Sequence, residues 1–351
     1  MRLIEREVEA LNDSVIMSVT VGDYDLLIDF EITHMLLDMK FRNYIMGLGL
    51  NNSPCFLCSC TKEDMCDKEK IAAGFTMDRS SLSLELAAEA LKYNPDNLPF
   101  SDLKKRAAGS KSIPLLKSRL EKCSFDSLHF LLAVGRFIYK IIVHFNAGLL
   151  GHWEIVGVIE KEYYQFHEKE LQDKLSSTLS IFAKFGVLDG NKCRKLLDIN
   201  NTEKVLNLLN DDVSEENRNN FRFILNELSY LYAVIGSSNP KENFCMQEFS
   251  HRSKSFMLWL VDTYPWFRIS TYLHIATSHA SEILKTQDSI GLYSTEVTES
   301  KHHWSLVYAA RNARRNDNLS RMHDVYFRAW MRSCPIVKSK GATTKRRVKK
   351  K

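Results

Sequence analysis

Hydrophobic and polar positions alternate near the start of the chain and follow a helical period over most of the rest. At residues 25–33, the apolar side chains of Leu26, Ile28 and Phe30 fall on one face of an extended segment. Successive side chains of a strand point to opposite faces, so this pattern predicts a half-buried strand. A second apolar run at 15–20, separated from the first by a Gly-Asp turn, predicts another strand.

Helical periodicity dominates after residue 33, and strand patterns nearly stop. Turn-forming sequences at 94–97, 189–191 and 237–240 separate the helical segments, and none is long enough to be a linker between independent domains. The pattern therefore favours a mostly α (α+β) protein. The predicted helices cover residues 83–92, 115–123, 127–145, 157–185, 202–209, 215–234 and 250–264.

The composition is that of a globular protein. The chain has 351 residues, 44% of them hydrophobic, which is enough to bury a large core. Its most apolar stretch, 130–150, is interrupted by Arg136, Lys140 and His144, so we expect no membrane-spanning helix and no membrane partner. The charged N-terminus has no apolar centre of a signal peptide, which argues against export.

Positive charge is concentrated at the C-terminus. The segment 338–351 holds eight basic residues and no acid, and removing them from the net charge of +5 leaves −3 for the rest of the chain. A basic run of this kind is typical of a nuclear localisation signal or a nonspecific phosphate contact, although a solvated tail without a role has the same composition.

Four of the eight cysteines crowd into one short segment, as Cys55, Cys58, Cys60 and Cys66. Eight cysteines in 351 residues are too few for a disulfide scaffold. The clustering of four of them indicates a metal in a reducing compartment. The first two form a C-x-x-C knuckle whose thiolates can reach one Zn²⁺. A lone knuckle is half a site, and a redox pair has the same spacing.

Two histidines far along the chain have a spacing that suits the other half. His274 and His279 are separated by four residues, within the range common for paired zinc ligands. A Cys2His2 site would then join Cys55 and Cys58 to this pair. Cys60 and Cys66 compete for the same places, and two ordinary surface histidines are the alternative interpretation.

A more specific pattern follows the histidines. Residues 294–300 read S-T-E-V-T-E-S, and the segment 311–315 reads R-N-A-R-R. Together with the C-x-x-C and H-x4-H pairs, this passage resembles Transib-type DNA transposases and the catalytic subunit of the V(D)J recombinase. Landmarks at 128–130, 190–195 and 264–267 extend the resemblance over most of residues 1–335.

The resemblance implies an RNase H-like fold with a large helical zinc-binding insertion. In that family a metal site takes two cysteines and two histidines, here Cys55, Cys58, His274 and His279, and a catalytic glutamate follows at the distance of Glu299. The implied domains are a core remnant (1–50), the insertion (51–285), the glutamate helix with its basic region (286–335) and a disordered basic tail (336–351).

The implied chemistry is two-metal DNA strand cleavage and transfer. Two Mg²⁺ or Mn²⁺ ions held by carboxylates neutralise charge on both sides of an in-line displacement at phosphorus. Glu299 and Asp38 are the implied carboxylates in this chain, with Asp29 as the alternative to Asp38. Zn²⁺ would be structural. Phosphate contacts are expected from basic residues on the matching landmarks, which are Arg194, Arg311, Arg314 and Arg315.

One carboxylate of the family's set has no counterpart, because the core's first strands are expected to be missing from this chain. Two hypotheses follow. The chain is the C-terminal part of a nuclear transposase or recombinase that acts as a homodimer on transposon or recombination-signal DNA ends, with an accessory subunit as a further partner. Alternatively, it is a catalytically inactive domesticated transposase that binds DNA or protein in the nucleus.

Overall fold

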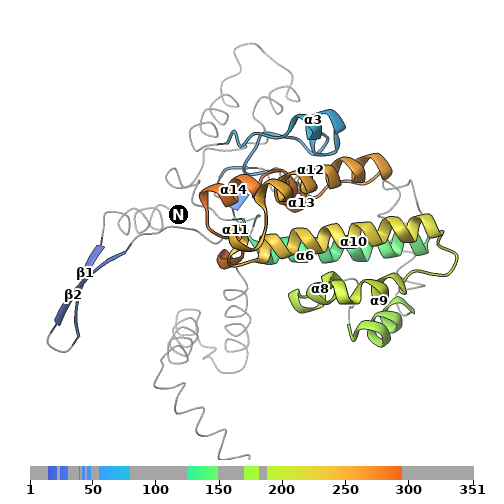
Figure 1. The fold of residues 1–351 in the computed structure, drawn as a ribbon, viewed down its shortest axis with the longest axis horizontal. Helices are drawn as coiled ribbons and strands as arrows, with labels where there is room; N and C mark the ends of the chain where they lie inside the picture. The colour runs from blue at the N-terminus through green and yellow to red at the C-terminus, as the bar shows by residue number, and fades with distance from the viewer. Residues whose placement is uncertain are drawn as a thin grey trace, which may run out of the picture. The chain divides into compact units, whose positions relative to one another are not determined.

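The computed structural model describes residues 15–21, 24–30, 39, 42–43, 46–48, 55–79, 125–148, 170–181 and 188–294 (Figure 1). The chain divides into two compact units, Met1–Ser294 and Thr295–Lys351, and all described residues belong to the first. These residues are mostly helical, as the periodicity predicts. The helices predicted at 83–92 and 115–123 lie outside them.

A two-stranded hairpin precedes the helices. Strand β1 (Val15–Val21) pairs with β2 (Tyr24–Phe30) in antiparallel register, Val15 opposite Phe30 and Val21 opposite Tyr24. Residues 22–23 connect the strands, the position at which the sequence has Gly-Asp. The second strand is described as far as Phe30, and the predicted residues 31–33 lie outside the described residues.

The helical body is built around α6 (Ser127–Asn146). Asp126 caps its N-terminus by accepting a hydrogen bond from the backbone N–H of Leu128 at 3.0 Å. Helix α6 packs against α8 (Gly190–Leu197), α10 (Glu215–Gly236) and α13 (Thr271–Ser278), and Figure 1 shows it side by side with α10. The other α-helices among the described residues are α3 (Lys68–Ala73), α9 (Thr202–Leu206), α11 (Pro240–Asn243), α12 (Met246–Thr263) and α14 (Ala280–Thr286).

Aromatic side chains fill the core between these helices. Phe130, Phe221 and Phe256 are at most 1% exposed and come from α6, α10 and α12. By length and composition α6 could cross a membrane, but 72% of its most apolar 18-residue stretch is buried inside the protein. The protein's own side chains therefore cover most of that surface, which is how an apolar helix is stabilised in a packed core.

Local backbone chemistry explains two of the differences from the sequence prediction. The expected turn at 189–191 is the start of α8, because the carboxylate of Asp189 accepts a hydrogen bond from the backbone N–H of Lys192 at 3.0 Å and caps a helix. The helix predicted over 157–185 is described only at 170–181. It ends at residue 179, since Ser180 has a left-handed φ of 52° that no α-helix continues through.

Candidate metal site

The C-x-x-C knuckle is a tight turn held by hydrogen bonds. The backbone N–H of Leu57 points at the sulfur of Cys55, 3.4 Å away. Arg79 holds the turn from outside: its Nε donates to the carbonyl oxygen of Cys58 at 2.7 Å, and its backbone N–H donates to the carbonyl oxygen of Leu57 at 3.1 Å. No sequence pattern indicates this role of Arg79. These contacts fix the direction of both thiols.

The two histidines lie where one helix ends and the next begins. His274 is inside α13, and His279 is the residue between α13 and α14. On an unbroken α-helix, side chains five residues apart would be separated by about 140° around the axis. His279 instead has φ −121° and ψ −20°, outside the α-helical values. With this break, the two imidazole centroids lie 5.0 Å apart.

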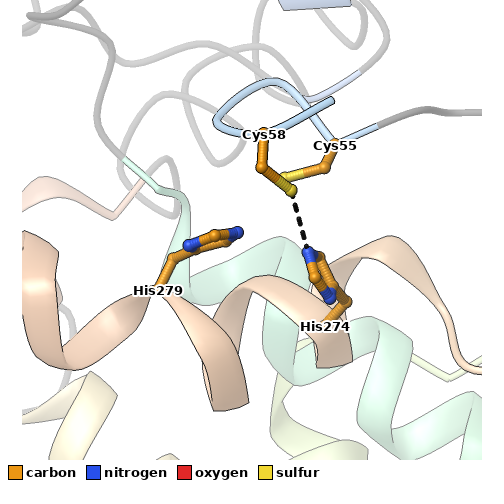
Figure 2. A group of neighbouring side chains, drawn as sticks. All are labelled: Cys55, Cys58, His274 and His279. Carbon is orange, nitrogen blue, oxygen red and sulfur yellow. Dashed lines mark hydrogen bonds between the residues drawn. The ribbon is translucent and has the colours of Figure 1, made fainter. Parts of the chain in front are cut away.

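The structure brings the four predicted ligands together. One ligand atom from each of Cys55, Cys58, His274 and His279 lies within 4.8 Å of the others. Figure 2 shows both thiols above the two imidazoles, with the sulfur of Cys58 3.3 Å from Nε2 of His274. All four side chains are between 0% and 2% exposed. Segments more than two hundred positions apart in the sequence therefore meet at this point.

The chemistry of this cluster fits Zn²⁺. Two thiolates and two imidazoles are a common tetrahedral donor set for that ion. His279 is 0% exposed, and neither of its ring nitrogens has a hydrogen-bond partner. A buried polar atom without a partner costs about 1–3 kcal/mol, so natural proteins rarely leave one. A bound metal ion would remove this cost at one nitrogen, which makes the orphaned ring an independent indication of a metal.

The titration of the cluster also favours a cation. Burial alone would raise the pKa of the Cys55 thiol, but hydrogen bonds with its cysteine neighbours lower it well below the ordinary value. The pKa of Cys58 is lowered as well, because its hydrogen bonds with Cys60 and His274 outweigh the raising effects of Cys55 and of burial. Burial lowers the pKa of His274 and so favours its neutral form. Thiolate sulfur and neutral imidazole are the forms that bind metals.

The competing cysteines have different surroundings. The sulfur of Cys60 lies 3.1 Å from that of Cys58 and 3.4 Å from Nε2 of His274. The thiol of Cys66 points instead to the carbonyl oxygen of Phe267, 3.6 Å away. Only the first of these two extra cysteines therefore touches the candidate metal site.

An aromatic ring closes one side of the site. Phe75 meets the imidazole of His274 edge to face, with the ring centroids 4.7 Å apart. Such a contact contributes about 0.5–1.5 kcal/mol beyond area burial and restricts the rotation of the imidazole. Nothing in the sequence identified this residue, because a single phenylalanine after a helix carries no distinctive pattern.

Most of the other predicted site residues cannot be compared with this cluster. Asp38, Glu299, Arg311, Arg314 and Arg315 lie outside the described residues.

Arg194 is described, and its guanidinium donates to the hydroxyl of Tyr232 and to the side-chain oxygen of Asn191, each at 3.1 Å. The bond to Tyr232 connects α8 to α10, whereas the bond to Asn191 lies within α8. Its predicted contact with DNA remains a prediction.

Together, the fold and the cluster define a helical domain with a candidate Cys2His2 zinc site. Residues 123–289 match the family profile of the recombination-activation protein 1 (RAG1) ZnH2 domain. The matched region includes both histidines, whereas the C-x-x-C knuckle precedes it.

Over most of its length the chain is distantly similar to V(D)J recombination-activating protein 1. It is 23% identical to the protein of Oryctolagus cuniculus over 305 residues, which cover 84% of this chain and 27% of that protein. The Sus scrofa protein is 23% identical over 304 residues, with the same coverage. The Oncorhynchus mykiss protein is 22% identical over 324 residues, covering 89% and 28%. The chain thus spans about a quarter of the length of these curated relatives, and the relation predicted from the sequence is confirmed.

Proposed function

We propose that this chain is a zinc-stabilised, DNA-binding part of an RNase H-like recombinase or transposase, or a protein derived from one. The observation that carries the proposal is the buried Cys2His2 cluster, in a chain related over most of its length to V(D)J recombination-activating protein 1. In this proposal Zn²⁺ is structural. All four donors come from the protein and are buried, so no coordination position is open to water or substrate.

Zinc at this site would hold the knuckle to the helical body. The knuckle segment, which we define as residues 55–79, has little secondary structure beyond α3 and one 3-10 turn at Asp64–Cys66. It contacts α12 through exposed ion pairs such as Lys68 with Asp262. Exposed pairs contribute only about 0–1 kcal/mol, so a metal–ligand set would be the strongest connection.

The zinc assignment is tested by metal analysis of the purified protein. We expect about one zinc per chain by mass spectrometry of the intact protein and by elemental analysis. The double variant His274→Ala with His279→Ala removes both imidazoles and should lose the metal. His251→Ala is the matched control, because His251 is exposed and lies outside the cluster. Unchanged zinc in the double variant would refute the four-ligand assignment.

Positive charge around a cavity of the helical body supports binding to the DNA backbone. A cavity of about 360 Å³ lies between α6 and the segment 267–273, and its lining includes Arg136, Lys140 and Arg268. Lysine and arginine contacts to phosphates dominate the affinity of proteins for DNA and make it salt-dependent. We propose that these three cations contribute phosphate contacts in addition to those expected from Arg194, Arg311, Arg314 and Arg315.

Replacing the three cavity cations by glutamine tests that surface. Binding to duplex DNA should weaken at every sequence, and the slope of log affinity against log salt should fall by about 0.9 for each phosphate that the variant no longer neutralises. Lys62→Gln with Lys241→Gln is the control, because these exposed lysines do not line the cavity. Equal slopes for the two variants would exclude the cavity from the DNA-binding surface.

Catalysis is proposed on the family relation. Asp38 and Glu299 would be carboxylates of a two-metal centre that binds Mg²⁺ or Mn²⁺, and a third carboxylate would have to complete it. The alternative is an inactive, domesticated protein that retains DNA or protein binding. Nicking assays with Mg²⁺ on supercoiled DNA separate the two: activity abolished by Glu299→Gln supports the enzyme, whereas no activity with intact zinc and DNA binding supports the alternative.

Partners and location are proposed on the same relation. We propose a nuclear protein that self-associates as a homodimer and that works with an accessory subunit on transposon or recombination-signal DNA ends. Light scattering coupled to size-exclusion chromatography checks the dimer, and imaging of a tagged chain checks the location. A monomer at every concentration tested would contradict the first, and exclusion from the nucleus would contradict the second.

A further inference from the structure

A buried arginine contacts the C-x-x-C knuckle from the chain that precedes it. The side chain of Arg42 is only 1% exposed, and its guanidinium carbon lies over the ring of Phe56, 4.0 Å from the ring centroid. Phe56 is buried as well and stands in the sequence between the ligands Cys55 and Cys58. A cation over an aromatic ring is attracted most strongly where both groups are removed from water, as they are here.

The backbone around this arginine packs onto the same core as the knuckle. We call the described residues among 39–48 the linking segment. The N–H of Met46 donates to the carbonyl oxygen of Arg42 at 2.9 Å. The buried side chains Met39, Met46 and Leu48 belong to one hydrophobic cluster with Phe56. The linking segment is therefore anchored by packing, and the charge of one arginine is buried within that contact.

A charge at this position calls for a physical reason, because burying an ion is costly. Replacing a buried charge by an apolar side chain of similar volume is often neutral or even stabilising. We therefore expect Arg42 to do more than fill space. A planar guanidinium over the ring of Phe56 favours one orientation of that ring, and the backbone that carries the ring lies between two metal ligands. Arg252 of α12 makes the same kind of contact, over the ring of Tyr230 at 4.0 Å.

We propose that Arg42 couples the metal site to the linking segment. A metal ion bound by Cys55 and Cys58 fixes the knuckle and with it Phe56, whose ring then holds the guanidinium in place. The linking segment directly follows Asp38 in the sequence, so the same coupling would fix the chain that carries this proposed catalytic carboxylate. This coupling rests on the proposed function: it needs the zinc site, and its consequence for DNA cleavage needs the role of Asp38.

Hydrogen exchange of the full chain, measured by mass spectrometry with and without zinc, tests the coupling. In the wild type, a chelator should raise exchange in the linking segment on the order of tenfold. Arg42→Met keeps the length of the side chain but removes the charge. This variant should raise exchange there to a similar extent with zinc still bound, and the chelator should then add little. Arg42→Lys should restore part of the protection, because an ammonium group also binds aromatic faces.

Arg252→Met is the matched control, because it removes an arginine from a similar contact between α10 and α12. It should leave the linking segment, and the response of that segment to the chelator, unchanged. Coupling between two sites is reciprocal, so Arg42→Met should also weaken zinc binding on the order of tenfold in competition with a chromophoric chelator. Arg252→Met should not.

The outcomes separate this coupling from the zinc site itself. If the effects of the chelator and of Arg42→Met simply add, the two act independently and the coupling is overturned. A zinc-loaded wild type whose linking segment ignores the chelator would overturn it too. A wild type that binds no zinc would instead refute the zinc site. If Arg42→Met does not fold, Phe56→Leu removes the other half of the contact, and unchanged protection of the linking segment in that variant would overturn the coupling.

Discussion

Two connections in this protein join separate segments in different ways. The metal cluster joins the knuckle segment to α13 across more than two hundred positions, and it includes His279, whose buried ring nitrogens have no hydrogen-bond partner. Glu227 of α10 and Arg252 of α12 instead form a bidentate ion pair at 2.7 and 2.8 Å. In the ion pair both carboxylate oxygens accept a hydrogen bond, whereas the cluster needs a metal ion to bind its unpaired imidazole.

The same contrast extends to the segments that they connect. The helical body has an apolar core in which α6, α10 and α12 contribute fully buried phenylalanines. The knuckle segment contributes fewer core residues, such as Phe56, Met65 and Ile71, and in the proposal its metal donors attach it to the body. We therefore expect the body to be stable through packing and the knuckle segment through metal.

Metal removal should have the largest effect. Structural zinc contributes about 10–16 kcal/mol in small zinc-finger peptides, far more than any single contact in the body. Treatment with a chelator, or His274→Ala with His279→Ala, should increase hydrogen exchange throughout residues 55–79 while α6 and α10 stay protected. Exchange measured by mass spectrometry checks this, with His251→Ala as control. Simultaneous loss of protection in both regions would show that the body also depends on the metal.

Close packing in the body should be disturbed without any change in the metal. A Cβ atom added to Gly135 of α6 would overlap the sulfur of Cys193 in α8. Overpacking of this kind costs about 1–3 kcal/mol. Gly135→Ala should lower the free energy of unfolding by that amount and leave zinc content unchanged. Gly236→Ala is the control, since its nearest neighbour would lie 3.4 Å away, an ordinary contact. Equal stability of the two variants would indicate that α8 moves aside freely.

The ion pair between α10 and α12 should contribute a smaller amount. Glu227 has only 9% of its side chain exposed, and the guanidinium of Arg252 also stacks over the ring of Tyr230 at 4.0 Å. Glu227→Gln keeps the size but removes the charge, so we expect a loss of about 1–2 kcal/mol in urea unfolding. Glu203→Gln breaks the exposed pair with Arg222 and should cost less than about 1 kcal/mol. The reverse order would contradict this ranking by burial.

The sequence predicted the long helices well because their signals are redundant. Helices α6 and α10 have an apolar period, and each begins at a capping residue, Asp126 and Ser214. Short helices carried less information. The segment at Asp189 has both turn and N-cap chemistry, and only packing against α6 decides between them. The end of the helix before Ser180 could not be predicted, because serine is not a residue that typically marks a left-handed conformation.

The ligands of the site were visible in the sequence, but their meeting was not. C-x-x-C and H-x4-H are local patterns, and no periodicity indicates which distant segments come together. The family resemblance joined Cys55 and Cys58 to His274 and His279, while spacing alone left Cys60 and Cys66 as equal competitors. The structure separates these two, since the direction of a thiol depends on a turn whose supports, such as Arg79, leave no pattern in the sequence.

The smallest effect on the free energy of unfolding is expected from removing the N-cap of α8. This change tests whether a purely local contact stabilises the body. Hydrogen bonds from Lys192 outweigh the raising effect of burial and lower the pKa of Asp189 below the ordinary value. A lowered folded-state pKa means that the stabilisation is full above the ordinary aspartate pKa of about 3.9 and is lost as the pH falls through the lowered value. At neutral pH, Asp189→Ala should cost about 1 kcal/mol and Asp189→Asn a few tenths, because asparagine also caps helices. In acid the difference between wild type and Asp189→Asn should disappear in urea unfolding. A difference that persisted there would mean that the carboxylate acts through something other than its charge.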